Sequence, residues 1–316
     1  MQQPAPEAAP VSTSGGGLVK FHLLAIVTSV IWGTTFASTK VLIHHGLTPA
    51  TIMCIRFLLA YIGMLFFMRS NAKTQSWRDE GLLALAGITG GSLYFLTENT
   101  ALRYTTSANV GILVAVIPLA TALLTHFLMR GEPFRRNFLY GGALALIGVS
   151  MVMLNGHFVL ELNPLGDVLT LMAVVCWAFY GILLKKLEHY PTAFVTRKVF
   201  FYGIVTILPV FLFEPFTATP EALRDPTVSL NLLYLGLIAS LLCYLSWSFV
   251  VKKLGVVVCT NYLYLNPVAA LCVSAFILKE PFTPIALAGS VLILVGVYIS
   301  ERNKHLHHSK KRKESL

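Results

Sequence analysis

Apolar residues fall into long runs along this chain, and most charged residues lie in the short segments between those runs. An apolar run of about 20 residues is long enough to cross the hydrocarbon core of a bilayer as a helix. The pattern therefore predicts ten membrane-spanning helices and no soluble domain between them. The predicted spans are residues 20–43, 50–68, 81–100, 105–129, 137–154, 165–184, 195–213, 231–251, 257–278 and 282–300.

The composition supports this prediction. The 316 residues are 56% hydrophobic and only 12% charged, and the mean hydropathy is +0.72. A soluble chain of this length could not cover so much apolar surface, whereas a lipid bilayer removes the need to cover it. The predicted fold class is therefore an all-α membrane protein.

Basic residues predict the orientation of the spans. If the N-terminus is cytoplasmic, 19 of the 24 Lys and Arg residues lie on the cytoplasmic side and four on the opposite side, with Arg56 inside a span. Because Lys and Arg accumulate in cytoplasmic loops, we expect both termini in the cytoplasm and the protein in the plasma (inner) membrane. The net charge of +10 then reflects membrane orientation, and no nucleic-acid partner is expected.

The first half of the chain resembles the second half. The run from Pro118 to Glu132 closes with Glu-Pro-Phe, and so does the run from Pro267 to Glu280. Internal repeats of this kind in an apolar chain are typical of duplicated membrane bundles that meet around a transport site. Either proline can kink its helix or act as a hinge, because proline interrupts the helical hydrogen-bond pattern.

A second pair of matches gives the size of the repeat. Trp32 and Lys40 in the first span have counterparts at Trp177 and Lys185 in the sixth, with identical spacing. One repeat is therefore five helices, and an odd number requires the second copy to be inverted in the membrane. The predicted units are a disordered tail (1–18), a first five-helix repeat (19–155), a second five-helix repeat (160–300) and a basic cytoplasmic tail (301–316).

Several motifs together resemble one known family. They are Trp32-Gly33 with Phe36, the Arg56-Phe57 pair, the segment from Ala101 to Thr105 and the two proline-to-Glu-Pro runs. Over residues 20–300 the chain is similar to the ten-helix EamA type of the drug/metabolite transporter superfamily. The resemblance implies a basket of two inverted repeats around a central cavity. Helices 1, 3, 4, 6, 8 and 9 would line the cavity, and helices 5 and 10 would brace the far end.

Glu98 is the most informative candidate site residue, because it places a carboxyl group inside the third predicted span. A carboxyl in hydrocarbon is costly, so Glu98 is expected to face a wet cavity, to find a partner or to stay protonated. It would then bind a substrate amine or carry a coupling proton. The alternative is a position near the outer end of the span, where Glu98 pairs with Arg103.

Arg56 lies about two turns into the second predicted span. Its guanidinium fork would suit a substrate carboxylate. A structural role near the helix end is the favoured interpretation, since the family resemblance places helix 2 at the rim of the basket.

The other candidates are aromatic and amide side chains on helices that the resemblance places around the cavity. Aromatic walls suit amphipathic substrates such as apolar amino acids. The same aromatic residues are ordinary packing residues in membranes, and the amides can instead bridge helices. These candidates are Trp32, Tyr94, Asn99, Asn109, Trp177, Tyr180, Tyr244, Trp247, Asn261 and Tyr264.

Motifs of common enzyme classes are missing from the sequence: it has no zinc-protease motif, P-loop or nucleophile elbow. No metal and no cofactor are expected. We therefore predict a secondary transporter that exports a small organic metabolite, such as an amino acid, by alternating access. The alternative is a membrane protein without transport activity, either a lipid-modifying enzyme or a sensor.

Overall fold

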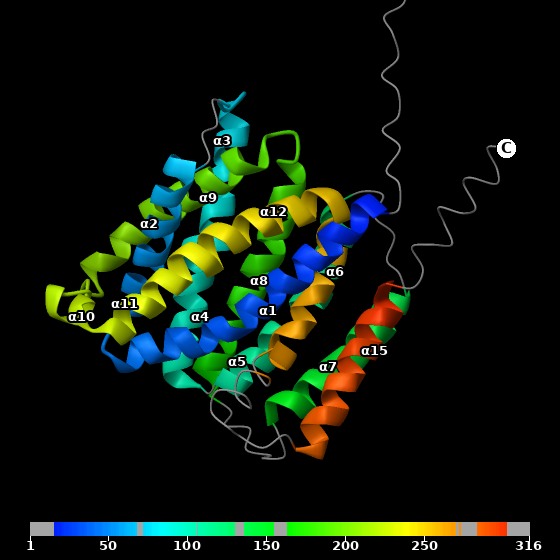
Figure 1. Ribbon diagram of the computed structural model, residues 1–316. Coiled ribbons are helices and arrows are strands. Elements are labelled where there is room, and N and C mark those ends of the chain that lie inside the picture. Colours follow the sequence, from blue (N-terminus) through cyan, green and yellow to red (C-terminus); the bar gives the residue numbers. More distant parts are fainter. Residues whose placement is uncertain are drawn as a thin grey trace, which may run out of the picture.

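A computed structural model describes residues 16–67, 72–105, 107–129, 136–154, 163–269, 272 and 283–301. These residues form a bundle of helices and contain no β-strand (Figure 1). The predicted tails lie wholly or largely outside the described residues, as do Glu132 and Glu280.

The first-half spans predicted from the sequence all coincide with helical segments. The helix from Trp77 to Tyr104 is continuous but changes type in the middle, and the fourth predicted span is divided into two helices. The elements are α1 (Gly16–His44), α2 (Pro49–Phe67), α3 (Trp77–Gly87), η1 (Ile88–Ser92), α4 (Leu93–Tyr104), α5 (Ser107–Val114), α6 (Ile117–Leu128) and α7 (Arg136–Leu154).

The second half follows a similar plan, although the ninth predicted span is described only to residue 269 and at residue 272. Two short elements, α10 and α11, follow the loop after the seventh span. The elements are α8 (Pro164–Lys186), α9 (Thr192–Ile207), η2 (Leu208–Leu212), α10 (Pro220–Arg224), α11 (Pro226–Leu233), η3 (Tyr234–Leu242), α12 (Cys243–Leu254), α13 (Val256–Asn261), η4 (Tyr262–Leu265) and α15 (Pro284–Glu301).

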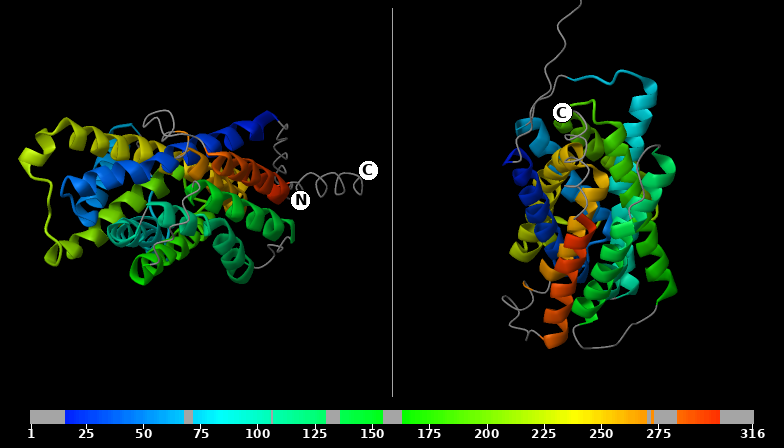
Figure 2. Two further views of the ribbon diagram at one scale, coloured as in Figure 1. Left: turned by 90° about the horizontal axis from the view of Figure 1, so that it is seen from below. Right: turned by 90° about the vertical axis from the view of Figure 1, so that its right-hand side faces the viewer.

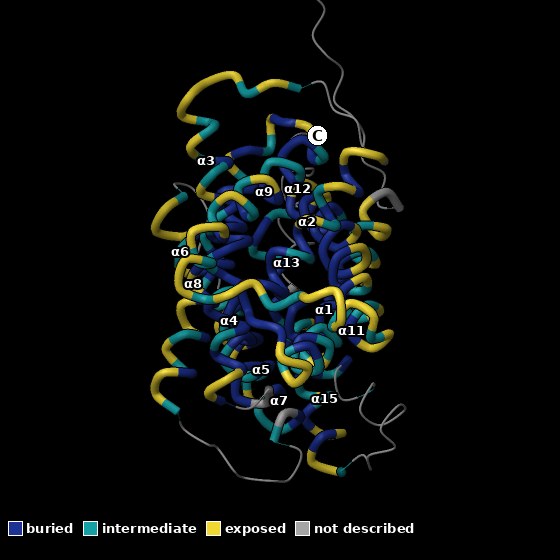
Figure 3. Tube along the Cα trace, turned by 90° about the vertical axis from the view of Figure 1, so that its left-hand side faces the viewer, coloured by how far each residue is buried: buried dark blue, intermediate teal, exposed yellow. Residues whose placement is uncertain are grey.

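Six described helical segments are long and apolar enough to cross a membrane, and three shorter helices are also apolar. Large apolar side chains such as Leu23, Val27 and Phe127 are exposed on the outside of the bundle. Buried residues gather in its interior (Figure 3). Apolar residues on the outside and polar residues such as Arg56 and Glu98 inside are the arrangement expected when lipid is the solvent.

Local sequence explains several helix ends. The side chain of Asn163 accepts a hydrogen bond from the Gly166 amide at the start of α8, and Pro164 occupies the first turn. Between α12 and α13, Gly255 has φ +87°, a left-handed conformation that favours glycine. This glycine lets the chain leave α12 and begin α13 at once.

The third helix of the first half and the eighth predicted span share an unusual feature. Each contains a π-helical stretch, η1 and η3. At η1 the neighbouring helices approach closely. A Cβ added at Gly90 would lie 2.4 Å from the Tyr180 ring, and one at Gly91 would lie 2.8 Å from the Phe57 ring. Glycine at these positions lets α8 and α2 pack against η1, which brings their side chains toward the middle of the bundle.

Helices α7 and α15 pack side by side at one end of the molecule (Figures 1 and 2). Their contact is made by backbone at two glycine pairs. A Cβ at Gly148 would lie 2.5 Å from the Gly289 carbonyl oxygen, and a Cβ at Gly141 would lie 2.4 Å from that of Gly296. Small residues at such positions allow membrane helices to approach closely. This pair lies away from the cavity described next.

Candidate functional site

A cavity with an empty volume of about 420 Å³ lies among α1, α2, α4, α8 and α12. Helix α5, the start of α6 and the region of η4 close another side of it. The lining residues are Trp32, Thr35, Phe36, Arg56, Tyr94, Phe95, Glu98, Val114, Ile117, Trp177, Tyr244, Leu263 and Asn266.

A second hollow of about 290 Å³ shares four lining residues with the first cavity and extends past it to Gly111, Ala115 and Pro267. It lies beside the break between α5 and α6, which precedes Pro118. It also reaches Pro267, which follows the short 3-10 helix η4. Both prolines predicted as kinks therefore follow a local interruption of the α-helix next to the open space.

Aromatic rings form one wall of the cavity. Trp32 and Trp177 meet edge to face, with ring centroids 5.2 Å apart, and both contact Tyr244. Trp32 Nε1 donates to the Ala239 carbonyl at 2.9 Å, and the Tyr244 hydroxyl donates to the Gly90 carbonyl at 2.6 Å. These bonds hold the rings in place. The buried Nε1 of Trp177 has no hydrogen-bond partner among the described residues.

Arg56 is 2% exposed and reaches the cavity from α2. Its Nε donates to Ser240 Oγ at 2.9 Å, and its guanidinium carbon lies 4.1 Å from the centroid of the Phe95 ring. This stacking is a favourable cation–π contact. Arg56 forms no ion pair with a described carboxylate.

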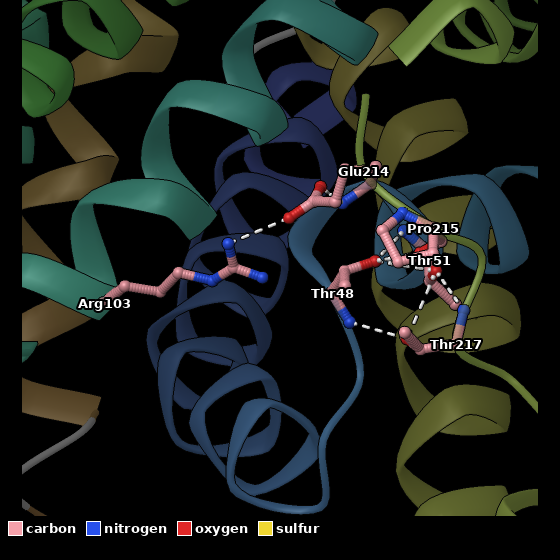
Figure 4. A network of polar contacts seen from close by, with 7 residues as sticks. Thr48, Thr51, Arg103, Glu214, Pro215 and Thr217 are labelled. Carbon is pink, nitrogen blue, oxygen red and sulfur yellow. Dashed lines mark hydrogen bonds and ion pairs between the residues drawn. The ribbon is translucent and has the colours of Figure 1, made fainter. Parts of the chain in front are cut away.

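Glu98 enters the same cavity from α4 and is 6% exposed. The Tyr94 hydroxyl, one turn earlier on α4, donates to Glu98 Oε1 at 2.5 Å. Arg103 does not pair with Glu98. Its Nη1 lies 2.8 Å from Glu214 Oε1, on the segment after η2 (Figure 4). Arg103 and Glu98 are five residues apart on a helix, so they project in different directions.

The charged groups of Arg56 and Glu98 are close enough to interact electrostatically although they form no ion pair. The expected location of Arg56 at the rim is corrected: Arg56 lines the cavity. The physical reason is that α2 packs against α4 and η3. The bond from Arg56 to Ser240 ties α2 to η3, which agrees with the structural role that was favoured for it. Its buried neighbour Phe57 lies in an aromatic cluster with Phe95 and Tyr244.

Five of the predicted substrate-binding residues line the cavity: Trp32, Tyr94, Glu98, Trp177 and Tyr244. The other six are buried without being part of its described lining. Trp247 and Tyr180 stand behind the wall, with Trp247 packed on Trp32 at 5.1 Å and Tyr180 packed on Trp177 at 5.2 Å. The four further residues are Asn99, Asn109, Asn261 and Tyr264.

The surroundings of these four residues differ from one to the next. Asn109 donates to Thr105 Oγ1 and so bridges one turn at the junction of α4 and α5. Tyr264 belongs to the small apolar cluster beside α7 and α15. Asn261 is buried at the end of α13. Asn99 is fully buried, and neither atom of its amide has a partner in the described chain.

The sequence did not single out Phe95, Val114, Ile117 or Leu263, which also line the cavity. These apolar residues carry no chemical signal that separates them from packing residues. Phe95 is the exception, because its position one turn before Glu98 on the same helix face could have marked it as a lining residue.

Two networks of polar contacts tie helices and loops together outside the cavity lining. At one end, Thr48 and Thr51 bond Thr217, and Arg103 pairs with Glu214, so the segment after η2 is tied to α2 and α4 (Figure 4).

At the other end Glu80, at the start of α3, pairs with Lys198 of α9 at 2.5 Å and also accepts hydrogen bonds from Tyr202 and Thr74. Burial alone would raise the pKa of Glu80. The bonds from Lys198, Thr74 and Tyr202 outweigh burial and lower that pKa to about 2.

The helical bundle and its central polar and aromatic cavity define a multi-pass membrane protein of the transporter class. The chain matches the EamA-like transporter family over residues 19–154 and again over residues 164–301. It belongs to that family.

Related proteins align with nearly the whole length of this chain. An uncharacterized transporter of Archaeoglobus fulgidus is 30% identical over 90% of this chain and 99% of the relative. A probable amino-acid metabolite efflux pump of Salmonella typhimurium is 30% identical over 89% and 94%. A probable terminal-alkyne amino-acid exporter of Streptantibioticus cattleyicolor is 28% identical over 88% and 92%.

One solved crystal structure aligns with a TM-score of 0.72 at 16% identity, covering 91% of this chain and 97% of the solved chain. At this identity the similarity concerns the fold alone.

Proposed function

We propose that this protein is a secondary transporter that exports amino acids or similar small organic metabolites across the plasma (inner) membrane. The observation that carries the proposal is the buried cavity, which combines a cation, a carboxyl group and an aromatic wall inside an apolar bundle. Small-molecule sites have this composition, with mostly apolar walls and a few converging polar groups. Two relatives named as amino-acid metabolite efflux pump and amino-acid exporter agree with this substrate class.

The architecture in this proposal is ten transmembrane helices in two inverted five-helix repeats, 19–155 and 160–300. The two family matches support it. Helix packing supports it as well: α4 packs on α8 as α12 packs on α1, and α2 packs on η3 as α9 packs on α3. The third helix of each half also carries the π-helical stretch. The excess of Lys and Arg on one side of the predicted spans supports a cytoplasmic position for both termini.

The mechanism in this proposal is alternating access. Inverted halves can exchange conformations, which opens the cavity first to one side and then to the other. The Glu80–Lys198 contact ties α3 to α9, and the Arg103–Glu214 contact ties α4 to the segment after η2. Release of one contact at a time would open one end. Relatives named as transporters and efflux pumps favour this mechanism over a lipid-modifying enzyme or a sensor, so we propose no enzymatic activity.

Transport is tested with purified protein in liposomes loaded with a panel of radiolabelled amino acids, with and without a pH gradient. We expect efflux of at least one apolar amino acid, and no such efflux from loaded liposomes that lack the protein. Acceleration by the gradient in the native protein and not in Glu98→Gln would assign proton coupling to Glu98. The absence of flux for every panel member, in protein shown to be folded, would contradict the proposed function.

A further inference from the structure

The terminal nitrogens of Arg56 are available to a ligand. Only its Nε donates to a described residue, Ser240, and the ring of Phe95 holds one face of the guanidinium group. Arg56 lines the cavity although the residue as a whole is 2% exposed. A buried guanidinium without a carboxylate partner is costly. Its free edge presents two parallel donors that match the two oxygens of a carboxylate.

Glu98 offers the opposite charge in the same space. Tyr94 occupies Oε1, and Oε2 accepts no hydrogen bond from a described residue. Glu98 lines the cavity, so this oxygen is the one left for a ligand there. An ammonium group has three donors and no acceptor, so it is a suitable partner for this oxygen.

The two charged groups form no ion pair with each other in this structure. Arg56 contacts Ser240 and Phe95 instead, and Glu98 accepts a hydrogen bond from Tyr94. A ligand with one charge would satisfy one group and leave the other buried and unpaired. A ligand with a carboxylate next to an ammonium would satisfy both and would add no net charge to the cavity.

We propose that Arg56 and Glu98 bind the head of an α-amino acid in its zwitterionic form, Arg56 through the carboxylate and Glu98 through the ammonium. This assignment rests on the proposed transport function and specifies its substrate class. Trp32, Trp177 and Tyr244 then enclose an apolar or aromatic side chain.

Two further polar atoms in the lining fit this ligand. Trp177 Nε1 is a buried donor without a partner among the described residues, and Asn266 Oδ1 is a buried acceptor in the same condition. Both residues line the cavity. A zwitterion offers carboxylate oxygens to Trp177 Nε1 and ammonium hydrogens to Asn266 Oδ1. The same four groups thus explain why polar atoms remain unpaired in an otherwise apolar wall.

The test compares ligands that differ in one charge. Native protein in liposomes is assayed for counterflow of radiolabelled L-phenylalanine and L-leucine. Phenylethylamine, which lacks the carboxylate, and 3-phenylpropionate, which lacks the ammonium, serve as competitors. We expect each analogue to compete at least about tenfold more weakly than L-phenylalanine, because each leaves one buried charge unpaired.

Two variants assign the charges to residues. In Arg56→Gln, L-phenylalanine and phenylethylamine should compete equally. In Glu98→Gln, L-phenylalanine and 3-phenylpropionate should compete equally. Exposed residues of α10 supply the matched controls, Arg224→Gln and Glu221→Gln, which should keep the native order of competitors. A variant that fails to fold does not weaken the test, since the analogue series on native protein is decisive by itself.

The outcomes separate this inference from the proposed function. Counterflow of both amino acids with equal competition by the analogues would overturn zwitterion binding and leave transport intact. Transport of phenylethylamine or 3-phenylpropionate without transport of the amino acids would also overturn zwitterion binding and leave transport activity intact. If none of the four compounds is bound or moved by folded protein, the zwitterion assignment fails, and the wider amino-acid panel decides the proposed transport function.

Discussion

Trp32 and Trp177, which are matched by the internal repeat, meet edge to face in the cavity wall with ring centroids 5.2 Å apart and ring planes at 89°. They come from α1 and α8, the first helices of the two halves. A pair of matching residues in contact lies where the two halves meet, so the cavity is at the proposed repeat interface. Substrate sites of inverted-repeat transporters commonly lie at such an interface.

Trp177→Phe tests the wall directly. Phenylalanine keeps most of the aromatic surface and removes the buried Nε1 donor, which has no partner among the described residues. We expect thermal stability in detergent to stay the same or rise, because an unsatisfied buried donor is lost. The KM for amino-acid flux should rise by about tenfold if this N–H bonds the substrate carboxylate.

Trp32→Phe is the matched comparison. Its Nε1 donates to the Ala239 carbonyl, so the same substitution should cost about 1 kcal/mol of stability and change KM less. Equal effects of the two substitutions on both stability and KM would contradict the distinct roles of the two N–H groups.

Backbone contact between α7 and α15 leads to a second prediction. Gly148→Val should destabilise the protein by about 2 kcal/mol or more, since its Cβ would lie 2.5 Å from the Gly289 carbonyl oxygen. The control is Gly81→Ala on α3, where a Cβ meets nothing within 4 Å. That change should be neutral or stabilising, because alanine is a better helix former. Melting temperatures in detergent measure both. A tolerated valine at 148 would show that the two helices are not in close contact.

The sequence predicted the helices well and the site only in part. Within the described residues, long apolar runs predicted where the helices lie, because the length of a span is set by the bilayer. The family resemblance placed helices 1 and 6 around the cavity and so made Trp32 and Trp177 candidate lining residues, but it did not predict that their rings touch. Arg56 is expected at the rim because the family resemblance places helix 2 there. The direction in which its side chain points around the helix cannot be read from the sequence.

Glu98 and Asn99 illustrate the same limit. They are neighbours in sequence and both are fully or nearly buried, yet only Glu98 lines the cavity. Successive residues on a helix project about 100° apart, so depth alone does not distinguish them. The π-helical stretches η1 and η3 shift that direction further and have no clear sequence signal.

The Glu80 network leads to a prediction about acid. The pKa of Glu80 in the folded protein is about 2, below its ordinary value near 4.5. Its contribution to stability is therefore fully present above pH 4.5 and decreases as the pH falls toward 2. Glu80→Gln should lose about 1 kcal/mol at neutral pH, because the group is partly exposed to solvent. The difference from native protein should vanish near pH 2.

The control for this prediction is Glu188→Gln, since Glu188 pairs with Lys185 and its side chain is 41% exposed. An exposed pair within one helix turn contributes little, so stability should change by less than about 0.5 kcal/mol. Unfolding curves of native protein, Glu80→Gln and Glu188→Gln across the pH range give the free energy of unfolding of each. A Glu80→Gln deficit that is constant down to the acid limit would contradict the assigned pKa.

The Arg103–Glu214 pair is expected to hold one end of the bundle shut. Arg103→Gln should loosen the segment after η2 and increase the access of a hydrophilic thiol reagent to a cysteine placed at Thr35 in the cavity wall, assayed from that end. The native cysteines Cys54, Cys176, Cys243, Cys259 and Cys272 must first be replaced. Exchange of the two charges, Arg103→Glu with Glu214→Arg, should restore protection, because the pair is re-formed with opposite polarity. Labelling that stays at the native rate in Arg103→Gln would show that other contacts, such as those of Thr48 and Thr51 with Thr217, are sufficient to keep this end closed.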